Sequence, residues 1–221
     1  MIKISNKECY KTVKGSGEAL LIEKKSKFIA HVRPVTSEEE ALAFLQEMRT
    51  EYSDATHNVY AYIIDENNIF RYSDDGEPSG TSGMPTLDTI RKEGLVDVAV
   101  VVTRYFGGTL LGTGGLVHAY GSACREGLIN AGIVTRLLCR QLSVTVDYTM
   151  VGKMQYAIAT GGYILEDTIY EDDVTFCVCL KKEEIQKFTD EVTEITCGKA
   201  IIKNTGQRYV DIDENKEGGL L

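Results

Sequence analysis

Glycine is concentrated between an apolar segment and a segment with helical periodicity. Residues 96–103 hold five valines, one alanine, one aspartate and one threonine, which predicts a strand covered on both faces. A helix is predicted over 116–130, with Gly132 at its end. Between them lie Gly107, Gly108, Gly112, Gly114 and Gly115. A strand followed by a glycine-rich turn and a helix is the feature that most constrains the fold.

This glycine segment predicts an anion site at residues 112–115. Glycine allows another backbone or a ligand to come close, and a helix N-terminus presents free N–H groups. Arg104 follows the strand and can offer a planar fork to phosphate or carboxylate. His118 could face an anion bound there, and the alternative is a plain surface histidine. The segment contains neither G-x-x-x-x-G-K-[ST] nor G-x-G-x-x-G. A tight turn with close helix–strand packing therefore remains the alternative.

An acidic, turn-rich loop over 74–83 is a second candidate site. Its polar side chains are Asp74, Asp75, Glu77, Ser79, Thr81 and Ser82. The carboxylates could hold a divalent cation, Glu77 could act as a base, and the hydroxyls could bond a ligand. The alternative is that these side chains bond backbone groups of the loop. His57 is a candidate base without an evident nucleophile partner, or else a buried or capping imidazole.

Aromatic residues cluster near the predicted sheet. They are Tyr60, Tyr62, Tyr72, Tyr105 and Phe106. Strand-borne aromatics beside an arginine are typical of single-stranded RNA recognition, and equally of ordinary cores whose hydroxyls reach the surface.

The remaining pattern predicts two α+β domains. Strands are expected over 19–23, 27–35, 58–65 and 69–73, and a helix over 85–93. Another helix is expected to start at residues 36–40, where the hydroxyl of Thr36 or Ser37 can cap it and Glu39 or Glu40 can complete a capping box. From about residue 139 the order becomes β-α-β-β-α-β, the ferredoxin-like unit. We therefore expect an N-terminal domain over 1–135, a ferredoxin-like domain over 136–205 and a polar, frayed tail over 206–221.

Charge and cysteine usage exclude several classes of protein. Acidic residues number 33 and basic residues 24, so an overall basic nucleic-acid clamp is excluded, although a local basic patch is not. No apolar stretch reaches a membrane span, and residues 1–8 contain no apolar segment typical of export. The six cysteines form no C-x-x-C pair, which favours reduced thiols in a cytoplasmic protein. We expect no structural zinc, no other metal and no cofactor.

Four motifs in order resemble the IMPACT family, and within it the bacterial YigZ-type members. The motifs are His57-x-x-Tyr60-Ala61-Tyr62, Asp74-Asp75-Gly76-Glu77-Pro78-x-Gly80-Thr81-x-Gly83-x-Pro85, Val102-x-Arg104-Tyr105-Phe106-Gly107-Gly108-x-x-Leu111-Gly112-x-Gly114-Gly115-Leu116, and Ala119-Tyr120. The motif region covers residues 28–131, and the trailing segment is similar to the family's C-terminal domain. At position 118 relatives usually carry a basic residue, whereas this chain has histidine.

The resemblance implies a fold and a setting. It implies an N-terminal domain like that of a small-subunit ribosomal protein and of domain IV of elongation factor G. The C-terminal domain would resemble domain V of that factor. Eukaryotic relatives regulate translation by binding the activator of an amino-acid-starvation kinase, which implies a role around translation.

Three hypotheses follow for function. The first is a translation-associated protein that binds RNA, the ribosome or a translation-regulating protein partner through Arg104, Tyr105, Phe106, the five glycines and His118. The second is an enzyme acting on a phosphorylated small molecule or nucleotide, with the glycine loop holding phosphate and Glu77 or His57 transferring protons. The third is a protein-interaction module without a ligand.

Overall fold

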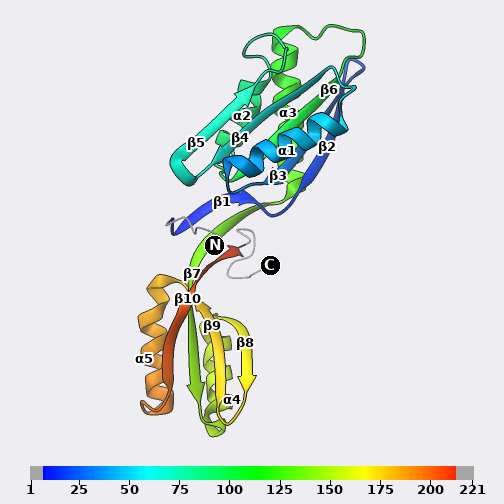
Figure 1. Cartoon of the computed structure of the whole chain (residues 1–221). Helices are drawn as coiled ribbons and strands as arrows, with labels where there is room; N and C mark the ends of the chain where they lie inside the picture. Colours follow the sequence, from blue (N-terminus) through cyan, green and yellow to red (C-terminus); the bar gives the residue numbers. More distant parts are fainter. Residues whose placement is uncertain (1–6, 213–221) are drawn as a thin grey trace. The chain divides into compact units, whose positions relative to one another are not determined.

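The computed structural model describes residues 7–212 (Figure 1). The chain divides into two compact units: Tyr10–Thr135 forms one, and the described residues up to Cys9 and from Arg136 onward form the other. Residues 1–6, part of the segment inspected for an export signal, and 213–221, the end of the expected tail, lie outside the described residues.

The N-terminal unit is built on a five-stranded antiparallel sheet of order β2-β3-β6-β4-β5. The elements in chain order are β1 (Cys9–Val13), β2 (Gly17–Glu23), β3 (Ser26–Pro34), α1 (Glu38–Glu51), β4 (His57–Ile64), the 3-10 turn η1 (Glu66–Asn68), β5 (Ile69–Ser73), α2 (Gly83–Lys92), β6 (Val98–Tyr105) and α3 (Gly112–Ala131). One sheet face packs on α2 and α3 and the other on α1, so each face has its own apolar core (Figure 1). β6 is central, and its residues 98–104 are all buried, as its run of valines predicts.

Register across the central strands positions the candidate site. Arg104 on β6 lies opposite Phe28 on β3 and opposite His57 on β4. Alternation along β6 turns Arg104 toward the same side as Val100 and Val102, which pack against α2 and α3. The end of β6 therefore presents Arg104 to the loops that precede these two helices.

The start of α1 follows the capping pattern expected from its sequence. Ser37 Oγ accepts a hydrogen bond from the backbone N–H of Glu40 at 3.2 Å. The Glu40 carboxylate in turn accepts from the backbone N–H of Thr36 at 2.7 Å. The first bond satisfies an N–H group that the helix leaves free at its first turn, and the second ties the residue before the cap to that turn.

Two elements begin where the sequence did not predict them. α3 starts at Gly112, four residues before the expected start at 116, because glycines of low helix propensity make up much of its first turn. β1 was not predicted, since its five residues carry no clear alternation of apolar and polar side chains.

The C-terminal unit has the expected β-α-β-β-α-β order. Its elements are β7 (Ile133–Val146), η2 (Tyr148–Met150), α4 (Val151–Gly161), β8 (Ile164–Tyr170), β9 (Val174–Leu180), η3 (Lys182–Glu184), α5 (Ile185–Thr196) and β10 (Ile201–Ile212). Its five-stranded sheet has the order β1-β7-β9-β8, and β10 also pairs with β7. An apolar core between this sheet and its two helices includes Phe176 and Phe188.

The expected tail instead forms strand over residues 206–212. β10 continues through this segment because it pairs with β7. An ion pair joins the two strands, with Arg136 Nε on β7 lying 3.0 Å from Asp211 Oδ1 on β10. A half-exposed strand of polar residues resembles a tail in composition, which explains the difference. Over the described residues the chain is thus a mixed α/β protein with two antiparallel sheets and five α-helices. No helix between residues 7 and 212 has the length and apolar character needed to cross a membrane.

Candidate ligand cavity in the N-terminal unit

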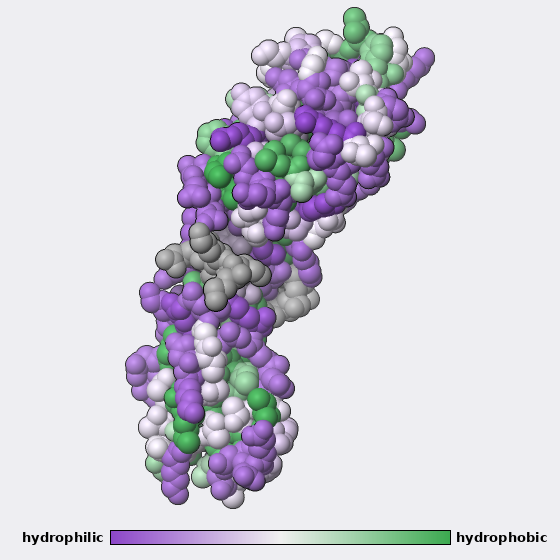
Figure 2. Space-filling model, viewed as in Figure 1, coloured by the Kyte–Doolittle hydropathy of each residue, from purple (hydrophilic) through white to green (hydrophobic). Residues whose placement is uncertain are grey.

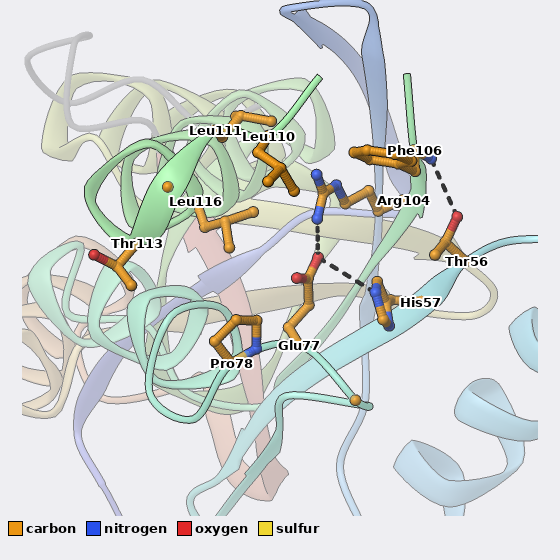
Figure 3. A pocket seen from close by; sticks show the side chains of 12 residues that line it. Thr56, His57, Glu77, Pro78, Arg104, Phe106, Leu110, Leu111, Thr113 and Leu116 are labelled. Atoms are coloured by element: carbon orange, nitrogen blue, oxygen red, sulfur yellow. Dashed lines mark hydrogen bonds and ion pairs between the residues drawn. The ribbon is translucent and has the colours of Figure 1, made fainter. Parts of the chain in front are cut away.

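A cavity of about 450 Å³ opens where the predicted motif segments converge (Figure 3). Its walls come from the start of β4, the acidic loop, the end of β6, the glycine segment and the first turn of α3. The lining residues are Thr56, His57, Gly76, Glu77, Pro78, Arg104, Phe106, Leu110, Leu111, Gly112, Thr113 and Leu116. Ligand sites are commonly concave, mostly apolar and lined by a few polar groups, and this cavity has that character.

A buried ion pair forms one wall of the cavity. Arg104 Nη1 donates to Glu77 Oε1 at 2.5 Å, and their side chains are 6% and 3% exposed. Tyr120 on α3 donates its hydroxyl to the same oxygen at 2.8 Å. Burial, reinforced by the Glu77 charge, raises the pKa of the Tyr120 hydroxyl, so this group stays a donor. The expectation that Arg104 offers a free fork to phosphate is thereby corrected, because Glu77 already takes one end of it.

Arg104 nevertheless retains one unsatisfied donor. Its Nε is buried and has no hydrogen-bond partner among the described residues. Its Nη2 donates to Ser26 Oγ at 3.4 Å, and its Cζ lies 5.6 Å from the centre of the Phe106 ring. A buried donor without a partner is costly, so this wall is suited to a polar or anionic group.

His57 lies beside Glu77 and points toward its carboxylate (Figure 3). Its Nδ1 lies 2.8 Å from the backbone oxygen of Asp75, which acts as acceptor and so places the imidazole proton on Nδ1. Nε2 then lies 3.8 Å from Glu77 Oε1. The structure therefore brings His57, Glu77 and Arg104 together, which the sequence proposed only as separate candidates.

The first turn of α3 is open at the mouth of the cavity. Gly112, Thr113 and Gly114 are exposed and Gly115 is half-buried, and no side chain caps this helix end. Gly112 has a φ of 74°, a conformation that side chains other than glycine rarely adopt. Free N–H groups and the positive end of the helix dipole favour an anion here. His118 is exposed one turn further along the helix.

The tight-turn alternative holds for Gly107. A Cβ at this position would lie 2.1 Å from the backbone carbon of Lys25, in the turn between β2 and β3. The Gly107 N–H also donates to Ser26 Oγ at 3.1 Å. Gly107 therefore serves packing, whereas Gly108, with a φ of 79°, lies in the exposed part of the loop.

The acidic loop is organised by Asp74 rather than by a cation. The Asp74 carboxylate accepts backbone bonds from Gly80, Ser82 and Gly83, and one from the Ser82 hydroxyl. Burial opposes ionisation, yet these hydrogen bonds lower the pKa of the Asp74 carboxyl. Thr81 Oγ1 likewise bonds the loop's own backbone, and Ser79 is exposed.

The other two carboxylates point elsewhere, so the cation-site alternative is not supported. Asp75 accepts from the backbone N–H of Asn58 at 2.7 Å, and Glu77 pairs with Arg104. Between residues 7 and 212 no three His, Cys, Asp or Glu side chains are grouped so that they could hold a metal ion.

We expect Asp74→Ala to lower the free energy of unfolding of the N-terminal unit by about 2 kcal/mol, because several charge-assisted bonds are lost. Since the folded-state pKa is lowered, this contribution is present above the unfolded pKa and is lost as pH falls through the folded value. Urea unfolding of wild type and variant at neutral and acidic pH measures this. A difference that stays constant down to low pH contradicts the role assigned to the Asp74 charge.

The aromatic residues do not form one surface. The rings of Tyr60 and Tyr62 stack on the α1 side of the sheet, with their centres 6.1 Å apart. The Tyr105 hydroxyl donates a hydrogen bond to Asp54 Oδ1 at 2.8 Å. Tyr72 lies at the edge strand β5 and is 40% exposed. Phe106 alone among them lines the cavity, with 47% of its surface exposed.

Sequence reasoning missed several apolar lining residues. Leu110 is 82% exposed, and apolar atoms are visible at the end of this unit where the loop joins β6 to α3 (Figure 2). The signal available in the sequence was a leucine within the glycine-rich loop. Pro78 and Leu116 complete the apolar lining from the acidic loop and α3.

Comparison with known proteins identifies both units. Residues 24–128 match the model of the Impact N-terminal domain, and residues 144–199 match a domain of unknown function, DUF1949. The chain is 41% identical over 203 residues to the IMPACT family member YvyE of Bacillus subtilis, covering 91% of this chain and 94% of that protein. It is 30% identical over 178 residues to the IMPACT family member YigZ of Escherichia coli, covering 79% and 87%.

A solved structure and eukaryotic proteins extend the similarity. A crystal structure described as a hypothetical protein aligns with a TM-score of 0.57 at 26% identity, covering 95% of this chain and all of that one. A protein IMPACT homolog of Dictyostelium discoideum is 42% identical over 101 residues, which are 43% of this chain and 29% of that protein.

Proposed function

This chain belongs to the IMPACT family, and from that membership we propose that it is a translation-associated binding protein that takes single-stranded RNA at the cavity of its N-terminal unit. The observation that carries the proposal is the open first turn of α3 at the mouth of this cavity. Backbone N–H groups there would receive a phosphate, as helix N-termini do elsewhere.

Two further features support RNA as the ligand. Phe106 exposes its ring beside the helix end and can stack on a base. Lys24, Lys25 and Lys27 are exposed at the turn between β2 and β3, which packs against Gly107. Because the chain carries nine net negative charges, contact with RNA is expected to be local, weak and sensitive to salt.

The buried pair of Arg104 and Glu77 makes Arg104 a poor test of this contact, since removing it disrupts the wall of the cavity. Thr113→Asp is a better test, because a carboxylate in the first turn of α3 favours the helix but repels phosphate. We expect the affinity for a single-stranded RNA oligonucleotide at low salt to fall about tenfold, equivalent to about 1.4 kcal/mol, without loss of stability. Fluorescence anisotropy over a salt series measures it, alongside ribosome co-sedimentation.

The matched control is Gly152→Asp in the first turn of α4. Gly152 is also exposed, but it lies in the C-terminal unit, and Asp147 already accepts a hydrogen bond from the N–H of Thr149 in the turn that leads into α4. We expect this variant to bind like wild type. Equal loss in both variants, or no retention of RNA or ribosomes at low salt, contradicts the proposal.

An enzyme is the second candidate, favoured by the approach of His57 Nε2 to Glu77 across the cavity. These groups could move a proton on a phosphorylated small molecule or nucleotide whose phosphate lies on α3. A thermal-shift screen with nucleotides and sugar phosphates separates the two functions. Stabilisation of several degrees by one metabolite, without RNA binding, favours the enzyme. If neither RNA binding nor stabilisation by a metabolite is observed, the third hypothesis remains, namely an interaction module that uses the exposed Phe106 and Leu110.

We also propose a specific fold for each domain, a cellular location and a set of partners. The pairing of β7 with both β9 and β10, and of β9 with β8, supports a ferredoxin-like C-terminal domain, resembling domain V of elongation factor G. The N-terminal domain, taken as residues 1–135, would be like domain IV of that factor and a small-subunit ribosomal protein. Six free cysteines support a cytoplasmic location, and partners would be RNA, the ribosome or a translation-regulating protein.

A further inference from the structure

A second groove, of about 310 Å³, lies on the α1 side of the N-terminal sheet, away from the cavity described above. It is bounded by β2, β3 and α1. The lining residues that matter for its chemistry are Glu18, His31, Arg33, Glu47, Glu51 and Tyr52.

His31 is buried in this groove with an unsatisfied nitrogen. The residue is 7% exposed, and its Nε2 is buried without a hydrogen-bond partner among the described residues. Its Nδ1 lies 3.6 Å from a carboxylate oxygen of Glu18. Its ring lies against Tyr52, with centres 4.6 Å apart. An imidazole that turns Nδ1–H toward Glu18 leaves Nε2 as a bare acceptor that lacks a donor.

The carboxylates around His31 are not all neutralised within the groove. Arg33 donates two hydrogen bonds to the Glu47 carboxylate, at 2.6 and 2.8 Å, so these two opposite charges neutralise each other. Glu18 and Glu51 remain as two negative charges near His31.

The electrostatics of His31 and Tyr52 are consistent with this excess. Burial lowers the pKa of His31 although Glu18 and Glu51 raise it, so the imidazole is neutral at pH 7. Burial and then the charges of Glu51 and Glu18 raise the pKa of Tyr52. The charges of the same two carboxylates therefore act on both rings, and both residues line the groove.

We propose that this groove binds an organic primary ammonium group. The ammonium donates to His31 Nε2, lies between the carboxylates of Glu18 and Glu51, and contacts the face of Tyr52. An ammonium has three donors and a positive charge, which match an acceptor nitrogen, two carboxylates and an aromatic ring. A metal ion fits less well, since no three such side chains in residues 7–212 are close enough to hold one.

The test is imidazole ¹⁵N NMR of the full chain, which has only three histidines, at constant ionic strength. The probes are 1,4-diaminobutane, representing a free diamine, and Nα-acetyl-lysine amide, representing a lysine of a peptide. Either probe is expected to move the His31 Nε2 resonance, and the one that binds tighter identifies the source. Glu18→Gln and Glu51→Gln are each expected to weaken binding about two- to fivefold, since both carboxylates are exposed and an exposed ion pair contributes at most about 1 kcal/mol.

Glu39→Gln is the matched control, because it removes the same charge from an exposed position of α1 outside the groove. It is expected to bind both probes like wild type. Absence of any His31 shift with both probes overturns the proposal. So do equal affinities in wild type, Glu18→Gln and Glu51→Gln, or a shift of His31 with MgCl₂ alone. None of these results bears on RNA binding at α3, which lies at a separate site.

Discussion

Replacing Glu77 with alanine is expected to lower the free energy of unfolding of the N-terminal unit by about 3–5 kcal/mol. The substitution leaves the Arg104 guanidinium buried without its carboxylate, and Tyr120 also loses its acceptor. A buried charge that has lost its partner cannot recover its hydration, so the loss exceeds that of a surface pair. Urea unfolding measures the loss of stability, and amide hydrogen exchange of residues in β6 and α3 shows that the loss lies in this unit.

Two further variants make this result interpretable. The double variant Glu77→Leu with Arg104→Met removes both charges and is expected to recover most of the stability. Glu93→Ala is the control, since Glu93 pairs with the exposed Arg125 at 3.3 Å, and it should cost within about 0.5 kcal/mol. A Glu77→Ala variant no less stable than Glu93→Ala contradicts the role of the buried pair.

Gly107→Ala is expected to destabilise the N-terminal unit by about 3 kcal/mol. The added Cβ would lie 2.1 and 2.2 Å from the carbonyl carbon and oxygen of Lys25, and these backbone atoms cannot move aside as a side chain can. The turn between β2 and β3 would have to separate from the end of β6. Urea unfolding with the same exchange readout measures the effect.

Gly114→Ala is the matched comparison and is expected to have the opposite sign. Apart from its chain neighbours and the backbone of its own helix, no described atom lies within 4 Å of a Cβ at this position, so alanine should stabilise by about 0.5–1 kcal/mol. If both substitutions destabilise equally, the distinction between a packing glycine and an exposed one is wrong.

Much of the N-terminal unit was predictable because local patterns agree with its fold. The valine run predicts β6, the hydroxyls of Thr36 and Ser37 followed by glutamates predict the start of α1, and Gly132 predicts the end of α3. The C-terminal element order was also predictable from alternation and periodicity. The strand over 206–212 was not, because its pairing with β7 is a long-range contact that composition does not reveal.

The candidate site was only partly predictable, for a physical reason. The sequence identified Arg104, Glu77 and His57, but it cannot show which charge neutralises which. Arg104 and Glu77 are 27 residues apart and meet only because β6 ends beside the acidic loop. Leu110 was missed because an apolar residue in a loop has no periodic pattern to indicate a role.

The most direct test of RNA binding at α3 is to follow the backbone amides of its first turn by ¹H–¹⁵N NMR while a short single-stranded RNA is added. We predict that the resonances of residues 112–115 shift most, that the shifts shrink as salt rises, and that Thr113→Asp needs about tenfold more RNA to reach half of them. Resonances of residues 112–115 that stay fixed while RNA is bound, or an absence of binding at low salt, would contradict the account.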